Sequence, residues 1–120
     1  MSVSGFTPFR TLAVIGLGLI GGSIAIDVKR LRLSKKIIGY DNNPKYKKLI
    51  LTQNFVDYLG DTPDEKLREA ELILLAVPVK AFPTVISKII PYISKSVIIT
   101  DVGSVKLPLI KLMKKPDYKN

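Results

Sequence analysis

A glycine-rich stretch near the start of this chain has the spacing of a phosphate-binding turn. Gly16, Gly18 and Gly21 form the pattern G-x-G-x-x-G directly after the apolar run 12–15. The first glycine allows a sharp turn out of a strand, the second leaves room for a pyrophosphate to touch the backbone, and the third lets a helix pack close to the strand. A helix N-terminus offers free N–H groups and partial positive charge to a phosphate. The stretch therefore predicts a site for a phosphorylated ligand.

An acidic residue stands where such a ligand needs a second contact. Asp41 closes the next apolar run, 37–40, and follows Gly21 by 20 positions. A carboxylate at this position accepts hydrogen bonds from ribose hydroxyls and repels a 2′-phosphate. Together the two features predict dinucleotide binding, with NAD favoured over NADP. Because glycine-rich turns are common, a tight strand–helix turn that binds nothing is the alternative interpretation.

The composition limits what other chemistry the chain can do. Its 120 residues suffice for one compact domain, and 47% of them are apolar, so we expect a real core. The absence of cysteine excludes disulfides, thiolate metal sites and a cysteine nucleophile. The absence of histidine removes the commonest general base and the commonest zinc ligand. We therefore predict no metal site.

The chain is strongly basic, with a formal net charge of +9. Nucleic-acid binding is one explanation, but the lysines are spread along the sequence and there is no arginine-rich arm, so we expect a solvated basic surface and no nucleic-acid partner. The uncharged stretch 11–26 carries four glycines and is shorter than the roughly 17–20 residues that cross a membrane. Charged residues, and no small-residue cleavage site, follow it. We expect a cytoplasmic protein without membrane contact.

Apolar runs alternate with helical patterns along the chain. Such alternation favours a parallel sheet covered on both faces. With the glycine turn, it predicts an α/β fold with a Rossmann-type, doubly wound sheet of order 3-2-1-4-5 in a single domain spanning 1–120. The ligand then lies across the carboxyl ends of the strands. We predict strands at 10–15, 36–40, 55–59, 72–77 and 96–100, and helices at 19–31, 44–54, 63–70, 81–90 and 105–114.

Local signals place several of the helix ends. Asn43 is a suitable N-cap with Pro44 at the first helical position. Thr62, with Glu65 three residues later, predicts the start of the helix at 63–70. Pro91 is expected to stop the helix at 81–90. The apolar face predicted for the first helix consists of Ile20, Ile24, Val28 and Leu31.

Four longer motifs resemble the N-terminal domain of the prephenate dehydrogenase family, which includes arogenate dehydrogenases. They are VIGLGLIGGSIA at 14–25, IIGYDNNP at 37–44, LILLAVPV at 72–79 and ITDVGSVK at 99–106. Their order and spacing match over nearly the whole chain. The family oxidatively decarboxylates prephenate to 4-hydroxyphenylpyruvate in tyrosine biosynthesis and passes a hydride to NAD or NADP. The resemblance implies the same fold and cofactor here.

The resemblance also implies roles for individual residues. Ser104 matches a family serine near the nicotinamide and the substrate hydroxyl, which would make it the catalytic candidate; its other interpretation is a helix N-cap. The positions that would hold the pyrophosphate are Gly16, Gly18, Leu19, Ile20 and Gly21, Asp41 would hold the adenosine ribose, and Ala76, Val77 and Pro78 would line the cofactor cleft toward the nicotinamide.

The sequence departs from the family in two respects. The family's catalytic histidine follows the Gly-Ser-Val-Lys motif, and this chain has no histidine. The family's helical C-terminal domain, which supplies dimerisation and much of the substrate pocket, is also absent. We therefore expect the NAD-binding domain of a prephenate dehydrogenase, inactive alone and at most weakly self-associating, which would meet prephenate or arogenate only with that other domain. The alternatives are the nucleotide domain of a related hydroxyacid dehydrogenase and a stand-alone dinucleotide-binding or sensor module.

Overall fold

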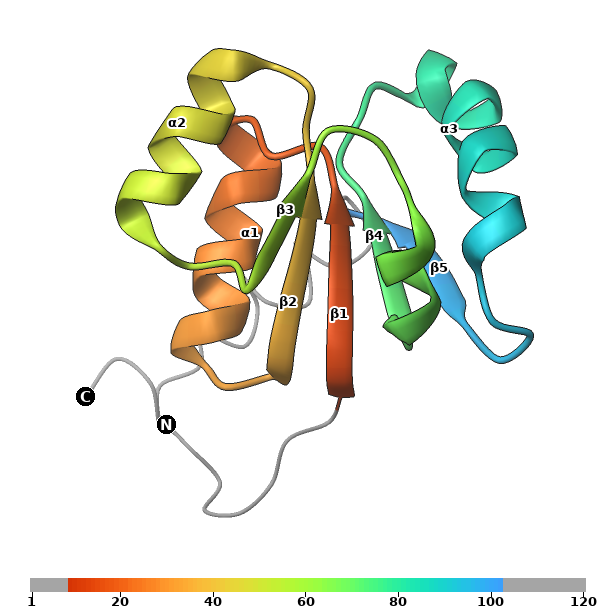
Figure 1. The fold of residues 1–120 in the computed structure, drawn as a ribbon, viewed down its shortest axis with the longest axis horizontal. Coiled ribbons are helices and arrows are strands. Elements are labelled where there is room, and N and C mark those ends of the chain that lie inside the picture. The colour runs from red at the N-terminus through yellow and green to blue at the C-terminus, as the bar shows by residue number, and fades with distance from the viewer. Residues whose placement is uncertain (1–8, 103–120) are drawn as a thin grey trace, which may run out of the picture.

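A five-stranded parallel sheet lies between two layers of helices in the computed structural model, which describes residues 9–102 (Figure 1). The strand order β3-β2-β1-β4-β5 and the parallel pairing confirm the predicted fold. All carboxyl ends therefore meet at one edge, and the order reverses between β1 and β4. The strands are β1 (Phe9–Ile15), β2 (Ser34–Tyr40), β3 (Tyr58–Gly60), β4 (Leu72–Leu75) and β5 (Ile98–Asp101).

The helical layers cover opposite faces of the sheet (Figure 1). α1 (Leu19–Arg30) and α2 (Pro44–Gln53) pack on one face. α3 (Phe82–Ile89) and the 3₁₀ turn η1 (Glu65–Glu69) pack on the other. Two further 3₁₀ turns, η2 (Val79–Ala81) and η3 (Ile90–Tyr92), flank α3.

Alternation along the central strands produces a core on each face. In β1, Leu12 and Val14 belong to the cluster beneath α1 and α2, whereas Ala13 and Ile15 belong to the cluster beneath α3. β4 divides its four buried residues in the same way. Continuous apolar strands are thus explained by burial on both faces, which keeps the central sheet rigid below the edge where the strands end.

Some predicted boundaries of the first half were wrong for local reasons. Ile20 is not part of the inward face of α1: it is 50% exposed, because α1 packs through Ile24, Ala25 and Val28. The third strand covers Tyr58–Gly60 instead of 55–59, since Phe55 turns into the core after the left-handed residue Asn54 (φ 53°). Asn43 and Pro44 begin α2 as predicted, and the Asn43 side chain accepts a hydrogen bond from the Lys45 N–H.

Boundaries in the second half also differ from the prediction. The helix predicted at 63–70 is the shorter turn η1, and its cap is Asp64 instead of Thr62. β4 ends at Leu75, two residues before the predicted end. The Ala76 N–H donates the last hydrogen bond to β1, to the Ile15 carbonyl at 2.8 Å, and the chain then leaves the sheet. α3 already ends at Ile89, and Pro91 lies inside η3.

One part of the prediction, the helix at 105–114, lies outside the described residues. Within 9–102 no helix combines the length and apolar character that a membrane span requires.

Candidate functional site: a groove at the carboxyl edge of the sheet

The three glycines of the turn meet different constraints. Gly16 has a φ of +94°, and a Cβ there would lie 2.7 Å from the Ala76 carbonyl oxygen. A Cβ on Gly21 would lie 1.9 Å from the Gly16 carbonyl oxygen. The fold therefore requires glycine at both positions. At Gly18 a Cβ would meet only the Tyr46 ring, at an ordinary 3.5 Å. Packing does not require glycine here, so the missing side chain serves to leave open space.

That open space lies at the N-terminus of α1. Gly18 is the N-cap and provides no side-chain hydrogen bond to the first turn, which also contains no acidic residue. The first N–H groups of a helix lack partners within the helix and carry partial positive charge. This end of α1 is therefore a suitable place for a phosphate group.

Asp41 ties the glycine turn to the end of β2. Its Oδ2 accepts a hydrogen bond from the Leu17 N–H at 2.7 Å, and its Oδ1 accepts one from the Asn43 N–H at 2.8 Å. The residue is half-buried. Each carboxylate oxygen has a further lone pair, so Asp41 can hold the turn in place and still accept a hydroxyl from a ligand.

A groove of about 380 Å³ runs across this edge of the sheet. Its floor includes Ile15, Gly16 and Tyr40, with Gly18 at the turn. Its walls come from the segments that follow β2 (41–43), β3 (61–63) and β4 (76–78), together with Val85 and Lys88 of α3. In open parallel sheets, ligands bind outside the carboxyl ends where the strand order reverses, and the groove occupies that place.

Tyr46 contributes to the site, although the sequence analysis did not select it. Pro44 occupies the first position of α2, which puts Tyr46 in the first turn of that helix. Its ring lies beside Gly18 and lines the groove. The sequence did contain a signal for Tyr46, namely the helix start at Asn43-Pro44. It places Tyr46 in the first turn of α2, which faces the glycine turn.

Two tyrosines and one carboxylate alter one another's acidity behind the wall at 61–63. Burial, followed by the hydrogen bond to Asp64, raises the pKa of Tyr40. The hydrogen bond to Asp64 also raises the pKa of Tyr58. Burial acts to raise the pKa of Asp64, but hydrogen bonds from Tyr58, Tyr40 and the Lys66 N–H outweigh it and hold that pKa below its ordinary value. Near neutral pH the group is one carboxylate and two neutral phenols.

Comparison with known proteins agrees with this geometry. A family model described as the nucleotide-binding domain of prephenate dehydrogenase matches residues 24–117, most of the chain. The chain belongs to this family. The glycine turn at 16–21 precedes the range matched by the family model. Its assignment as a phosphate site therefore depends on the geometry of the turn.

Individual relatives carry related names. The cyclohexadienyl dehydrogenase of Zymomonas mobilis is 38% identical over 107 residues, which cover 89% of this chain and 36% of that protein. Synechocystis arogenate dehydrogenase has a TM-score of 0.68 at 32% identity, covering 77% of this chain and 32% of that one. Prephenate dehydrogenase from A. aeolicus, solved with hydroxyphenyl propionate and NAD⁺, has a TM-score of 0.69 at 25% identity, with the same coverage. The chain thus spans about a third of the length of these relatives.

Most residues expected from the prephenate dehydrogenase resemblance lie at this edge of the sheet. Gly16, Gly18, Asp41 and the segment 76–78 all line the groove. Gly21 lies under the turn, against Gly16 and Ala76. The other expected positions divide into Leu19 and Ile20, which begin α1, and Ser104, which lies outside the described residues.

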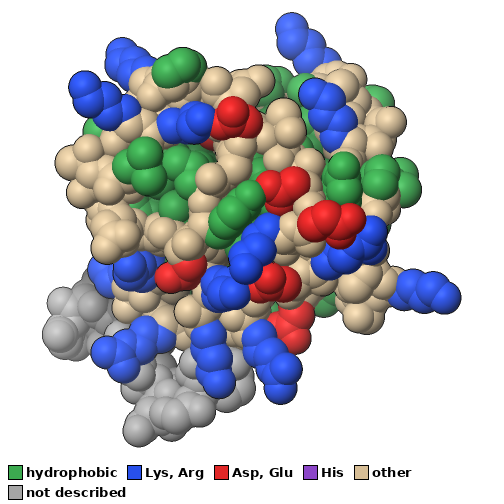
Figure 2. Space-filling model, in the orientation of Figure 1, with side chains coloured by type: hydrophobic (Ala, Val, Ile, Leu, Met, Phe, Trp, Pro, Cys, Tyr) green, Lys and Arg blue, Asp and Glu red, His purple; other side chains and the backbone are tan. Residues whose placement is uncertain are grey.

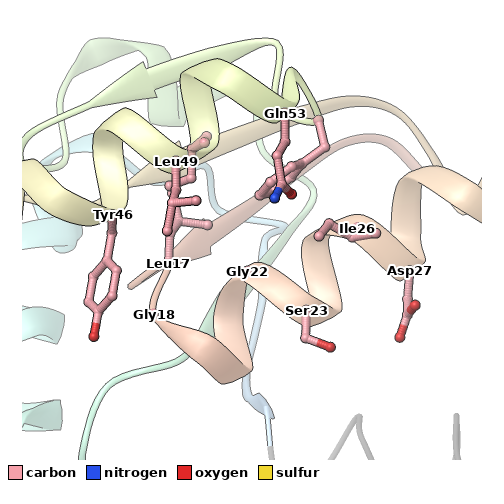
Figure 3. Close-up of a pocket in the computed structure, with 11 residues that line it drawn as sticks. Leu17, Gly18, Gly22, Ser23, Ile26, Asp27, Tyr46, Leu49 and Gln53 are labelled. Atoms are coloured by element: carbon pink, nitrogen blue, oxygen red, sulfur yellow. The ribbon is translucent and has the colours of Figure 1, made fainter.

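A second cavity of about 270 Å³ separates α1 from α2 behind the turn (Figure 3). Leu17 and Leu49 face each other across it, and Ile26 points into it from α1. Gly18 and Tyr46 line both this cavity and the groove. Tyr46 therefore forms part of the boundary between this cavity and the groove.

Basic side chains are scattered over the face shown in Figure 2, at its rim and near its centre, and acidic side chains lie among them. Several are paired with carboxylates, including Arg30 with Asp27 at 3.1 Å and Lys36 with Glu69 at 2.8 Å. The positive charge on this face is thus dispersed.

Proposed function

We propose that this chain binds NAD across the groove, as the cofactor domain of a prephenate or arogenate dehydrogenase. The observation that carries the proposal is the pairing of Gly18 with Asp41. The fold leaves Gly18 free of packing constraints beside a helix N-terminus, and Asp41 is fixed next to it with lone pairs to spare. The solved A. aeolicus relative, which was crystallised with NAD⁺, supports the same cofactor.

The residues of the groove fit the parts of a dinucleotide. The open space at Gly18 and the uncapped start of α1, with Leu19, Ile20 and Gly21, would receive the pyrophosphate. Asp41 would accept the hydroxyls of the adenosine ribose and disfavour a 2′-phosphate. The segment of Ala76, Val77 and Pro78 would then flank the nicotinamide half.

The reaction proposed for the whole protein is the oxidative decarboxylation of prephenate, or the corresponding reaction of arogenate. When bound, the cofactor supplies the hydride acceptor. Within this chain Ser104 would hydrogen-bond the substrate hydroxyl, but a serine alone is no base, and these 120 residues contain no histidine. We therefore assign this chain the cofactor-binding part of the reaction, with the proton acceptor and the second wall of the substrate pocket supplied from outside these 120 residues. A biosynthetic role of this kind suits the cytoplasm.

Two other functions have less support. The nucleotide domain of another hydroxyacid dehydrogenase would have a similar groove, but the matched family model favours prephenate dehydrogenase. A stand-alone dinucleotide-binding or sensor module would bind NAD but would catalyse no reaction, alone or with a partner domain. Sequencing the DNA downstream of codon 120 separates these cases. An open reading frame that continues into a histidine-containing helical domain supports the dehydrogenase, and a stop codon supports the module.

Calorimetric titration with NAD⁺ and with NADP⁺ tests the cofactor assignment. We expect NAD⁺ to bind and NADP⁺ to bind more weakly, because a 2′-phosphate would approach the Asp41 carboxylate. Equal or tighter binding of NADP⁺ would contradict the assigned role of Asp41. In that case Asn42, Asn43 and Lys45 would be the residues to examine as a phosphate site.

A further inference from the structure

The wall of the groove at 61–63 is held from behind by a three-residue cluster. We propose that Tyr40, Asp64 and Tyr58, named here the Tyr–Asp–Tyr cluster, position this wall and thereby set the affinity for the adenosine half of the dinucleotide. The inference rests on the proposed function, because it concerns how the same groove is shaped. Asp64 and Tyr58 do not line the groove, so they are positioning residues and not ligand contacts.

One carboxylate joins three elements in this cluster. Asp64 Oδ1 accepts a hydrogen bond from the Tyr40 hydroxyl at 2.7 Å and from the Lys66 N–H at 3.1 Å. Asp64 Oδ2 accepts a hydrogen bond from the Tyr58 hydroxyl. Tyr40 is the last residue of β2, Tyr58 the first of β3, and Lys66 belongs to η1. The carboxylate thus fixes the turn after β3 against two strands of the sheet.

The Tyr40 ring packs tightly against its neighbours in the fold. Tyr40 is 1% exposed, and its ring meets that of Tyr58 edge to face, with centroids 6.1 Å apart. Gly60 lies directly against Tyr40, since a Cβ there would be 2.9 Å from the ring. Tight packing of this kind transmits small displacements to neighbouring backbone, so a shift of Tyr40 moves the start of the wall.

The wall is short and is held at both ends. Only residues 61–63 separate Gly60 from Asp64. The Gly60 carbonyl accepts a hydrogen bond from the Asp41 N–H at 3.1 Å, and the Asp61 carboxylate forms an ion pair with Lys47 of α2. With so few residues between two fixed ends, the position of Thr62 and Pro63 follows from the hydrogen bonds of Asp64.

The wall lies on the adenosine side of the proposed site. Thr62 and Pro63 line the groove together with Asp41, on the side of β2 and β3. With the pyrophosphate at Gly18 and the ribose at Asp41, the adenosine half extends along this side. Displacing the wall would therefore weaken the binding of any ligand that contains adenosine.

The test replaces Tyr58 by phenylalanine, which keeps the ring and the Asp64 cap but removes the hydroxyl that donates to Asp64 Oδ2. Tyr40 is left unchanged because it lines the groove itself. The matched control is Asp57→Ala. This variant removes a 2.7 Å hydrogen bond that the Ile37 N–H of β2 donates to Asp57 Oδ2, just before β3. Neither residue lines the groove. Affinities for NAD⁺ and ADP-ribose are measured by calorimetry at a temperature where circular dichroism shows all variants folded, and the Thr62 amide is followed by NMR.

We expect Tyr58→Phe to weaken the binding of NAD⁺ and of ADP-ribose by the same factor, about threefold or more, which corresponds to about 0.7 kcal/mol. The Thr62 amide should shift in the free variant, and Asp57→Ala should bind as the unmodified chain does. If the unmodified chain binds NAD⁺ and the tyrosine variant binds it equally well, or both variants weaken it equally, the cluster has no positioning role while the proposed function stands. If the unmodified chain binds no NAD⁺, the proposed function fails and this inference fails with it.

Discussion

At the residue scale, glycines that look equivalent in the sequence have different causes. Glycine is required at positions 16 and 21 because a Cβ there would lie 2.7 Å and 1.9 Å, respectively, from a backbone oxygen, whereas Gly18 has room for a side chain. The motif predicted the turn and its place between a strand and a helix. It could not separate the structural glycines from the one that keeps a ligand site open, because that distinction depends on Ala76 and Tyr46, which are distant in sequence.

Substitution should separate the two kinds of glycine. Gly18→Val would fill the space assigned to the pyrophosphate, so we expect NAD⁺ affinity to fall at least about tenfold, or about 1.4 kcal/mol, with a smaller change in the free energy of unfolding. Calorimetry and urea denaturation measure the two quantities.

Gly21→Ala serves as the contrasting variant. Its Cβ would overlap the Gly16 carbonyl, and we expect a loss of stability of about 1–3 kcal/mol or more. A folded Gly18→Val variant with unchanged NAD⁺ affinity would mean that the turn is only structural.

Asp41 shows another limit of sequence reasoning at this scale. Its position at the end of β2 was predicted from the spacing to Gly21, and the structure places it beside the turn. Its hydrogen bond with the Leu17 N–H was not predicted, because it depends on how close the turn approaches β2. The carboxylate thus has a structural task within the chain in addition to the proposed ribose contact.

At the scale of elements, core strands were easier to predict than edge segments. β4 and the later parts of β1 and β2 are runs buried on both faces, so their pattern is strong and the positions of these strands were correct to within a few residues. The segment 63–70 was predicted as a helix capped by Thr62, with Glu65 as the second signal. Asp64 caps it instead, because its carboxylate also binds hydroxyls from β2 and β3. The local signal at Thr62 was misleading because the hydrogen-bond partners of Asp64 come together only in the folded sheet.

The Tyr–Asp–Tyr cluster should make stability depend on acid. The pKa of Asp64 is below its ordinary value in the folded chain, so the unfolded state takes up the proton first. The stabilisation is complete above the unfolded pKa, about 3.9, and is lost as the pH falls through the lower folded pKa. Urea denaturation as a function of pH should therefore show a decline below about pH 4.

Tyr40→Phe/Tyr58→Phe should flatten part of this decline, because the two hydroxyls are the strongest of the contacts that lower the Asp64 pKa, ahead of the Lys66 N–H. The Glu69 carboxylate, whose pKa is lowered by hydrogen bonds from Lys36 and Lys66, contributes equally in both proteins. Parallel pH curves for the two proteins would show that Asp64 does not couple to stability through the tyrosines.

At the scale of the whole molecule, the alternation of strands and helices was enough to predict the sheet order. Right-handed crossovers and the glycine turn at β1 leave few other arrangements, and the order β3-β2-β1-β4-β5 confirms the prediction. The groove could be placed at the carboxyl edge for the same reason. Asp41 and the segment 76–78 were predicted parts of its walls. The wall at 61–63 and the contribution of Val85 and Lys88 were not predicted, because they depend on how the turn after β3 and the helix α3 approach the sheet edge.

The chain alone should not turn over prephenate or arogenate. A positioned base contributes about 10²–10⁴-fold to a step of this kind, and positioning of the substrate contributes several kcal/mol more; these 120 residues contain no histidine and span about a third of the relatives. The measurement is NADH absorbance with either substrate, using protein already shown to bind NAD⁺. Turnover above a heat-treated control, lost in Ser104→Ala, would show that this domain carries its own catalytic groups.

The central claim is that a dinucleotide lies across the carboxyl edge with its pyrophosphate at the glycine turn. Two-dimensional amide NMR of the chain, titrated with NAD⁺, tests it most directly. We expect the largest shifts at the amides of Gly16, Gly18, Asp41 and Ala76, and smaller shifts at Gln53 and Phe55 in the cavity between α1 and α2. Shifts that centre on that second cavity, or that leave Gly18 unaffected at saturation, would contradict the account.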